Sequence, residues 1–323
     1  MRLRGAIVLA IAALAIAGRF ATQPASSGAA APPNVNWSAL LPALPSSIEP
    51  QPGPIPHCRE PRIKCIRTAV RRLTRLRNRL GCDHRAVFAT TYLELTKELL
   101  RTVRANPNFF RYPRYLYTED ALFANVYLDT LKAWQRGDPV PPAWRIALEN
   151  AAAGDLNGGQ DMLLGINAHV QNDMPFVLAA LGLRTRGGDS RKVDHDAGNE
   201  VLNRAYESVV KAVASRYDPL ITVTNSPATP LDDAAGLEMV RGWREGVWRN
   251  AERLLNANGN AERQAVADQI KANAAAWATT ISSAGLGLPG YRAQRDAYCA
   301  DPAGGSAGIP VPAGLPGLPV PLP

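Results

Sequence analysis

The sequence lacks the motifs that identify most of the familiar enzyme classes. It contains no P-loop and no H-E-x-x-H zinc motif. Its matches to G-x-S-x-G, at residues 304–308, and to G-x-G-x-x-G, at residues 285–290, do not directly follow an expected strand, as a nucleophile elbow or a dinucleotide fingerprint would. Nucleophilic serine or cysteine chemistry therefore has no support from the sequence. The four cysteines include no C-x-x-C pair, so their spacing does not suit a zinc ribbon either.

Alternating β-type patterns and long apolar runs are also scarce. The only strand-like piece is LITVTN at residues 220–225, and after the N-terminal region no run is long and apolar enough to span a bilayer. Apolar residues instead recur at helical spacing, and Thr118 and Pro142 mark expected helix starts. The sequence predicts an all-α fold, an orthogonal or bundle-like array of about seven or eight helices.

The N-terminal 17 residues have the layout of a secretory signal peptide. Two arginines precede the apolar run GAIVLAIAALAIA, and an A-x-A site stands before Gly18. Cleavage as late as residue 31 and an uncleaved N-terminal anchor are the alternatives. We expect a protein that is secreted or associated with the cell envelope.

The composition divides the rest of the chain into three parts. A Pro/Ala-rich lead-in precedes a helical domain, and a Pro/Gly low-complexity tail follows it. These parts span residues 18–60, 61–300 and 301–323.

The four cysteines favour two disulfides, because an exported protein folds in an oxidising compartment. A Cys65–Cys82 bridge is the least suitable pairing. A helix between these residues would separate them by about 25 Å, whereas bridged Cα atoms lie about 4.4–6.8 Å apart. We favour Cys58–Cys65 as a local disulfide and Cys82–Cys299 as a long-range disulfide.

The formal net charge of +8 is concentrated in the helix expected over residues 62–80. That helix carries eight arginine and lysine residues, and the rest of the chain is near balance. It is either a solvated face or a binding surface for an anionic envelope polymer or lipid, with Arg71, Arg75 and Arg79 in contact. The sequence shows no specific nucleic-acid motif.

The stretch GINAHVQND, residues 165–173, places His169 and Asp173 four residues apart in an apolar helix. The two share a stripe whose other members are apolar, so both should point inward. A buried carboxylate is costly unless it is paired or metal-bound, and Pro175 predicts a kink just beyond it. The pair is therefore either part of a metal site or a structural hydrogen bond.

A second polar stretch, DHDAGNEVLN, crowds Asp194, His195 and Asp196 at a helix start. Asp196, Asn199 and Asn203 then recur on one helical face, and we expect the two asparagines to line a pocket. Imidazole and carboxylate together suit zinc or a similar divalent ion. Alternatively, Asp194 is an N-cap and His195 a surface residue.

Two further stretches contain weaker candidates. His84 follows the expected cap Asp83 in GCDHRAV, and Asp120 lies near Tyr127 in EDALFANVY. Helix capping is the account we favour for both acids, Asp83 and Asp120. We expect Tyr127 and Asn167 to be pocket residues.

Four segments of the sequence together resemble an uncharacterised bacterial family, catalogued as domain of unknown function 5995. They are GCDHRAVFATTYL, EDALFANVY, GINAHVQNDMPFVL and DHDAGNEVLN. The resemblance covers residues 62–300. The most specific segment of this resemblance contains Asn167, Ala168, His169 and Asp173. It implies an all-helical domain and points to the same polar residues, but it supplies no reaction.

A weaker likeness is to the helical zinc-dependent phospholipase C and single-strand nuclease proteins, in which an H-x-x-x-D pair on a helix binds zinc. This chain departs from their three-zinc site because its only histidines are His57, His84, His169 and His195. The likeness therefore implies at most a site for one or two metals.

Two hypotheses from different classes follow. The first is a metal-assisted hydrolase of phosphoester or lipid substrates. Its ligands for a divalent metal, zinc first, would be His169, Asp173 and either His195 or Asp196. The second is a non-catalytic secreted or envelope-associated binding or structural protein, whose inward polar groups fix helix packing. The weaker ligand candidates are Asp194, Asp120 and His84.

The basic helix generates the first testable prediction. If it binds polyanions, changing Arg71, Arg75 and Arg79 to Gln abolishes retention on heparin or anionic vesicles, and wild-type retention weakens steeply with salt. Circular dichroism checks that the variant stays folded. Unaltered retention of the folded variant would leave the helix as a solvated face.

Overall fold

The computed structural model describes residues 36–41, 44, 50, 53–222, 230–283 and 290–301. Within these residues the chain is helical, and the only β-type pairings are two isolated bridges, Ile55–Cys58 and Arg184–Ser190. The predicted all-α fold is therefore confirmed. The expected signal peptide, most of the lead-in and residues 302–323 lie outside the described residues. Of the strand-like piece, residues 220–222 belong to a 3-10 helix and the rest is not described.

The helices share one compact unit. In chain order they are α1 (Trp37–Leu40), α2 (Lys64–Leu80), α3 (Ala86–Ala105), α4 (Pro113–Gln135), α5 (Pro142–Ala153), α6 (Gly158–Asn167), the π-helix η2 (Ala168–Asp173), α7 (Met174–Leu181), α8 (Lys192–Ala214), the 3-10 helix η3 (Pro219–Thr222), α9 (Pro230–Asn256), α10 (Asn260–Ser283) and α11 (Tyr291–Ala300). Among these helices we find none with the length and apolar character that a membrane crossing requires.

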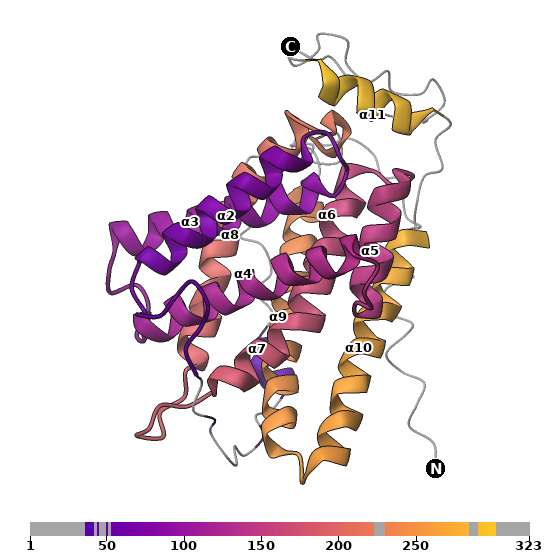
Figure 1. Cartoon of the computed structure of the whole chain (residues 1–323). Coiled ribbons are helices and arrows are strands. Elements are labelled where there is room, and N and C mark those ends of the chain that lie inside the picture. The colour runs from indigo at the N-terminus through magenta and orange to yellow at the C-terminus, as the bar shows by residue number, and fades with distance from the viewer. Residues whose placement is uncertain are drawn as a thin grey trace, which may run out of the picture. The chain divides into compact units, whose positions relative to one another are not determined.

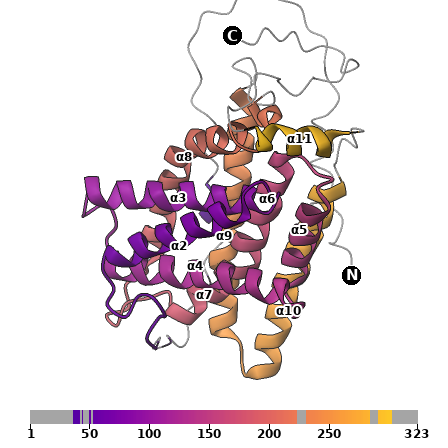
Figure 2. The same ribbon diagram turned by 45° about the horizontal axis from the view of Figure 1, so that its top comes forward.

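The helices form two groups that run across one another. Figure 2 shows α8, α3, α2 and α4 side by side in that order, and each packs against the next. In Figure 1 the long helices α9 and α10 lie next to each other and run across that layer. Helices α5 and α6 pack together and against α10, and α6 also contacts α3. The site described below is built where these groups meet.

Helix α4 begins earlier than the sequence suggests. Thr118 is not its cap, because its hydroxyl donates to the Arg114 carbonyl inside the helix at 2.9 Å. The helix starts at Pro113, whose missing N–H costs nothing in a first turn. The preceding N–H groups of Arg111 and Tyr112 donate to the Asp194 carboxylate of α8, at 2.7 and 2.6 Å. The Asp194 carboxylate therefore ties α8 to the backbone just before α4.

A π-helical turn separates α6 from α7. Pro175 has no N–H, and in a regular helix its ring would collide with the carbonyl of Gln171. The wider turn of η2 accommodates the proline, and the Met174 N–H donates to the His169 carbonyl, five residues back. The irregularity that Pro175 predicts thus takes the form of a π-helix that contains both His169 and Asp173.

Both disulfides that the sequence favours are present. Cys58 and Cys65 have their Cα atoms 5.1 Å apart, and Cys82 and Cys299 have theirs 5.7 Å apart. The second bridge ties α11 to the turn between α2 and α3. It closes a loop of 217 residues, which in the chain-entropy model stabilises the fold by roughly 5 kcal/mol.

A buried charge network holds α11 in the same place. The Arg295 side chain is 1% exposed and donates to the Leu156 carbonyl and to Asp161 Oδ2, the latter at 3.0 Å. Asp218 Oδ2 lies 3.7 Å from the guanidinium and accepts a hydrogen bond from the Tyr291 hydroxyl at 2.6 Å. A cation buried in this way is stable only because two carboxylates face it.

Removing Arg295 is therefore expected to destabilise the domain strongly. The Arg295→Ala variant removes the cation that faces two buried carboxylates and should lose about 3–5 kcal/mol of unfolding free energy, measured by urea denaturation under non-reducing conditions. The matched control is Arg292→Ala on the same helix, since its side chain is 58% exposed and should cost less than about 1 kcal/mol. Equal losses in the two variants would contradict the network's role.

Candidate functional site

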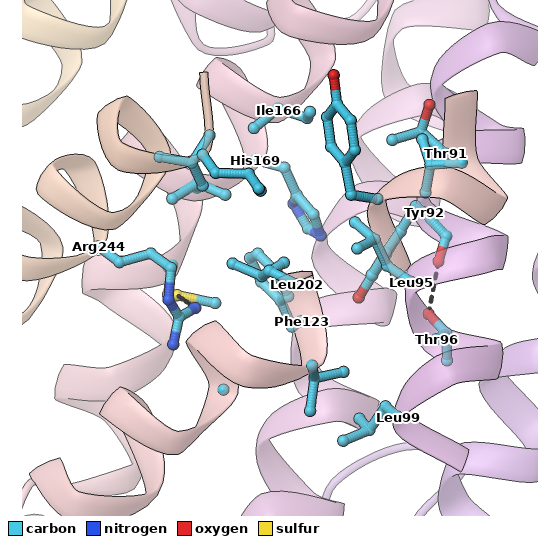
Figure 3. A pocket seen from close by; sticks show the side chains of 18 of the residues that line it. Thr91, Tyr92, Leu95, Thr96, Leu99, Phe123, Ile166, His169, Leu202 and Arg244 are labelled. Carbon is cyan, nitrogen blue, oxygen red and sulfur yellow. Dashed lines mark hydrogen bonds between the residues drawn. The ribbon is translucent and has the colours of Figure 1, made fainter. Parts of the chain in front are cut away.

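A cavity of about 470 Å³ lies between α3, α4, α6, α8 and α9. Most of the side chains that line it are aliphatic or aromatic, and Figure 3 shows part of this lining. The ionisable side chains in the lining are Tyr92, Glu119, Asp120, His169, Asp194, His195, Tyr206 and Arg244. The cavity thus combines an apolar wall with a few polar groups, which is the usual composition of a small-molecule site.

His169 and Asp173 form a hydrogen-bonded pair in the wall of the cavity. Nδ1 of His169 lies 2.9 Å from Asp173 Oδ2, and the two side chains are only 2% and 3% exposed. The carboxylate also accepts from Trp144 Nε1 at 2.8 Å and from Asn172 Nδ2 at 2.7 Å. Because an ionised carboxylate can only accept, the imidazole donates through Nδ1, and its proton is held there.

The other ring nitrogen of His169 is left with a free electron pair. Nε2 is buried and has no hydrogen-bond partner among the described residues. Burial lowers the pKa of His169 below 6.5, more strongly than Asp173 raises it. The ring is therefore neutral at pH 7, with Nδ1 protonated and Nε2 basic.

Aromatic rings fix the plane of the imidazole. Phe123 of α4 stacks on it with ring centroids 3.5 Å apart and planes 4° from parallel. Tyr92 and Phe88 of α3 approach it at 4.7 and 5.8 Å. Phe88 fits only because residue 165 is glycine, since a Cβ on Gly165 would lie 2.2 Å from the ring. The first residue of GINAHVQND thus makes room for the ring that packs against His169.

Asp120 and Tyr92 bring two more polar groups to this wall. Asp120 Oδ2 and the Tyr92 hydroxyl are buried and lack a hydrogen-bond partner in the part of the chain that the structure describes. Burial, together with the charge of Glu119, raises the pKa of Asp120 to about 7. Burial and the nearby Asp120 raise the pKa of Tyr92 well above 10. We call Nε2 of His169, Oδ2 of Asp120 and the hydroxyl of Tyr92 the polar end of the cavity.

A second cluster of polar side chains lies around Arg244 of α9. Figure 3 shows Arg244 apart from Tyr92, with His169 between them. Arg244 donates from Nε to Asn199 Oδ1 at 2.7 Å and from Nη2 to the His195 carbonyl. His195 Nε2 in turn lies 2.9 Å from the Arg244 carbonyl, so it carries the proton. Burial and the Arg244 charge lower the pKa of His195 well below 6.5. Burial also raises the pKa of Glu119 to about 7, although Arg244 opposes the shift.

The structure does not bring the predicted metal ligands together. Asp194 accepts from the backbone just before α4, and Asp196 is exposed on α8, where Lys192 donates to it at 2.8 Å. His84 bonds to Asp296 of α11 at 2.9 Å, outside the cavity. No group of three His, Cys, Asp or Glu side chains that could hold a metal ion occurs among the described residues. A divalent metal therefore stays a prediction from the sequence, without a ligand set in this geometry.

The residues that the sequence predicts for the pocket are not among those that line the cavity. Asn167 donates to the Ala274 carbonyl of α10 at 2.8 Å, and Asn199 accepts from Arg244. Tyr127 packs against Phe88 and Trp144 in the core. Within the described lining we find none of Asn167, Asn199, Asn203 and Tyr127. His169, Asp120, Asp194 and His195 do belong to the lining.

Sequence reasoning misses Tyr92, Phe123 and Arg244. An aromatic residue at helical spacing predicts a packed core as well as a binding wall, so neither ring gives a separate signal. Arg244 stands two residues before Gly246 in an otherwise ordinary amphipathic helix. Its contact with α8 depends on Gly198, where a Cβ would lie 2.8 Å from Nη2.

The basic row predicted on α2 lies at the surface. Arg71, Arg75 and Arg79 are exposed, whereas the opposite side of the helix buries Ile66 and Leu73. The geometry therefore leaves the arginines free to meet solvent or a partner.

The raised pKa of Asp120 predicts how stability depends on pH. The pKa is about 7 in the folded state and near 4 in the unfolded chain. The stability from the buried neutral acid is thus fully present below about pH 4 and is lost as the pH rises through about 7. At pH 8, Asp120→Asn should therefore be more stable than wild type by about 4 kcal/mol of unfolding free energy. At pH 4 the two proteins should be equally stable.

The matched control for this measurement is Asp129→Asn, on the same helix. The Asp129 side chain is 68% exposed, and its replacement should leave the pH dependence unchanged. A pH-independent difference between wild type and Asp120→Asn would show that Asp120 is not held as a neutral acid.

Comparison with known proteins places the chain in a family without a described activity. No curated protein and no solved structure matches it, so the weaker likeness to zinc-dependent phospholipases stays a prediction. A family model described as "Family of unknown function (DUF5995)" matches residues 66–284. That span covers more than half of the 323 residues and includes both His169 and Asp173. The chain therefore belongs to the family of unknown function DUF5995.

Proposed function

We propose that this domain binds an apolar, uncharged molecule in the cavity between α3, α4, α6, α8 and α9. The observation that carries the proposal is an apolar space of about 470 Å³ with a localised polar end. Protein interiors are normally packed to high density, so a cavity of this size among apolar side chains is unusual for a core that serves packing alone. Small-molecule sites of roughly 300–1,000 Å³ have this composition. A ligand that fills the space would recover the lost packing.

The polar end favours a ligand without charge. Asp173 is hydrogen-bonded to His169 next to this part of the cavity, and the acidic side chains of Asp120 and Glu119 belong to the lining itself. A second negative charge placed beside them would be repelled in a low-dielectric site. A carbonyl or hydroxyl oxygen, in contrast, can accept from Tyr92 or from protonated Asp120, and a hydroxyl can also donate to His169 Nε2. The ligand should therefore be a long-chain or ring compound with a neutral oxygen.

This proposal refines the two hypotheses from the sequence. Of the phosphoester and lipid substrates, the lipid class suits an apolar cavity with an acidic polar end. A non-catalytic binding protein would use the same cavity. Export and attachment to anionic envelope lipid through the exposed arginines of α2 are further parts of the proposal, and they would bring the domain to its ligand.

A fluorescence titration tests the proposal. The neutral dye N-phenylnaphthylamine should bind the purified wild-type protein with an increase in emission, and dodecanol should displace it at lower concentration than dodecanoate does. Leu202→Trp fills the cavity with a larger side chain, so dye affinity should fall at least about tenfold, or 1.4 kcal/mol.

The control variant carries the same substitution on the outer side of the same helix. Val193 is 48% exposed, and Val193→Trp should bind the dye as wild type does. Binding that Leu202→Trp leaves intact would place the dye elsewhere, and a wild type that binds no dye would refute the proposal.

A further inference from the structure

We infer that His169 is a general base that removes a proton from a carbonyl compound bound in the cavity, with Asp173 as its positioning residue. The inference rests on the proposed ligand-binding function, because the base needs a bound molecule to act on. It adds an activity and a substrate class, an apolar ketone or enone. Four observations support it, and they concern the base, the donors, the missing nucleophile and the shielding from water.

The first observation is the orientation of the base. Asp173 accepts from His169 Nδ1, Trp144 and Asn172, so the carboxylate has little freedom to turn. It therefore holds the imidazole in one tautomer, with the lone pair on Nε2. The stacked Phe123 ring prevents the imidazole from tilting out of its plane. A histidine held by a carboxylate in this way is pre-organised for proton transfer, because the geometry does not have to be found during the reaction.

The second observation is the pair of neutral donors beside the base. Tyr92 packs on the His169 ring with centroids 4.7 Å apart, and Asp120 acts on the Tyr92 hydroxyl more strongly than any other charge does. Burial keeps the Tyr92 hydroxyl protonated and holds a large fraction of Asp120 protonated near pH 7. Both can then donate hydrogen bonds to a carbonyl oxygen. Donors of this kind stabilise negative charge on that oxygen most strongly in a site that excludes water.

The third observation concerns the hydroxyl groups of the wall. Thr91 and Thr96 line the cavity, but their hydroxyls donate to the helix carbonyls of Val87 at 3.0 Å and Tyr92 at 2.7 Å. They are therefore not aligned with His169 as nucleophiles. Proton transfer on the ligand itself is the chemistry that the remaining groups support.

The fourth observation is that rings shield the base from water. Phe123, Tyr92 and Phe88 surround the imidazole of His169. A water molecule held there would need about two to four polar partners. Once the carbonyl oxygen of a bound ligand accepts from Tyr92 and Asp120, His169 Nε2 is the one member of the polar end left to a water molecule. A C–H group of an apolar ligand, in contrast, fits against aromatic rings. The site therefore suits removal of a proton from carbon better than activation of water.

The step balances without a further reactant. His169 Nε2 takes a proton from the carbon next to the carbonyl, and the electron pair of the C–H bond forms an enolate. The enolate oxygen accepts hydrogen bonds from the Tyr92 hydroxyl and from neutral Asp120. The imidazolium then returns the proton to the same carbon or to a conjugated one. The net reaction is proton exchange or double-bond migration, and no atom is gained or lost.

Deuterium exchange tests the inference directly. Methyl undecyl ketone is incubated with the full-length protein in deuterium oxide, and mass spectrometry measures deuterium uptake next to the carbonyl. Deuterium uptake with wild type should be faster than in buffer alone. His169→Gln should reduce the protein-catalysed part of the rate about 10²–10⁴-fold. Asp173→Asn should lower the rate while leaving ketone affinity within about twofold. Tyr92→Phe keeps the packed ring, so it tests the donor in a folded protein even where a His169 variant fails to fold.

The control is His84→Gln, a buried histidine that also faces an acid but lies outside the cavity. It should retain wild-type exchange. Ketone binding without exchange above buffer would overturn the acid–base inference and leave the proposed binding function standing. Full exchange by His169→Gln would also overturn it. Absence of both dye and ketone binding would instead refute the binding function on which the inference rests.

Discussion

The hydrogen bond between His169 and Asp173 is the interaction on which the cavity's chemistry depends. A carboxylate this deeply buried is stable only when its oxygens are satisfied, and Trp144, Asn172 and His169 Nδ1 together satisfy them. The requirement fixes the histidine tautomer and leaves Nε2 as the nitrogen without a partner among the described residues. The hydrogen bonding that stabilises buried Asp173 therefore also leaves His169 Nε2 as a basic atom in the wall of an apolar cavity.

The local geometry of this bond follows from three neighbouring residues. Pro175 accounts for the π-helical turn that holds both partners, Gly165 lets Phe88 pack close, and Phe123 stacks on the imidazole. π-Helical turns of this kind are frequent at functional sites, because they are costlier than regular helix and persist where a side chain must be placed. The far side of the cavity depends on contacts between α8 and α9, where Gly198 admits the Arg244 side chain.

The features that sequence reasoning predicts are those set by local pattern. Helical periodicity gives the all-α fold, and the apolar stripe around His169 and Asp173 points to their burial. Long-range packing decides the rest. The sequence suggests that Asp194 caps its own helix, yet its carboxylate accepts from the backbone just before α4. Asp196 shares a helical face with asparagines but faces solvent beside Lys192. The cavity itself arises between helices far apart in the chain, so periodicity within one helix cannot reveal it.

The tautomer of His169 is the most direct measure of this account, because both the cavity's chemistry and the core's stability require it. Nitrogen NMR of protein labelled with ¹⁵N-histidine separates protonated from bare ring nitrogens. At pH 7 the His169 ring should show a protonated Nδ1 and a bare Nε2, and an added apolar ketone should shift the Nε2 resonance most. A ring protonated at Nε2 or at both nitrogens would contradict the account, because no basic atom would then remain in the wall of the cavity.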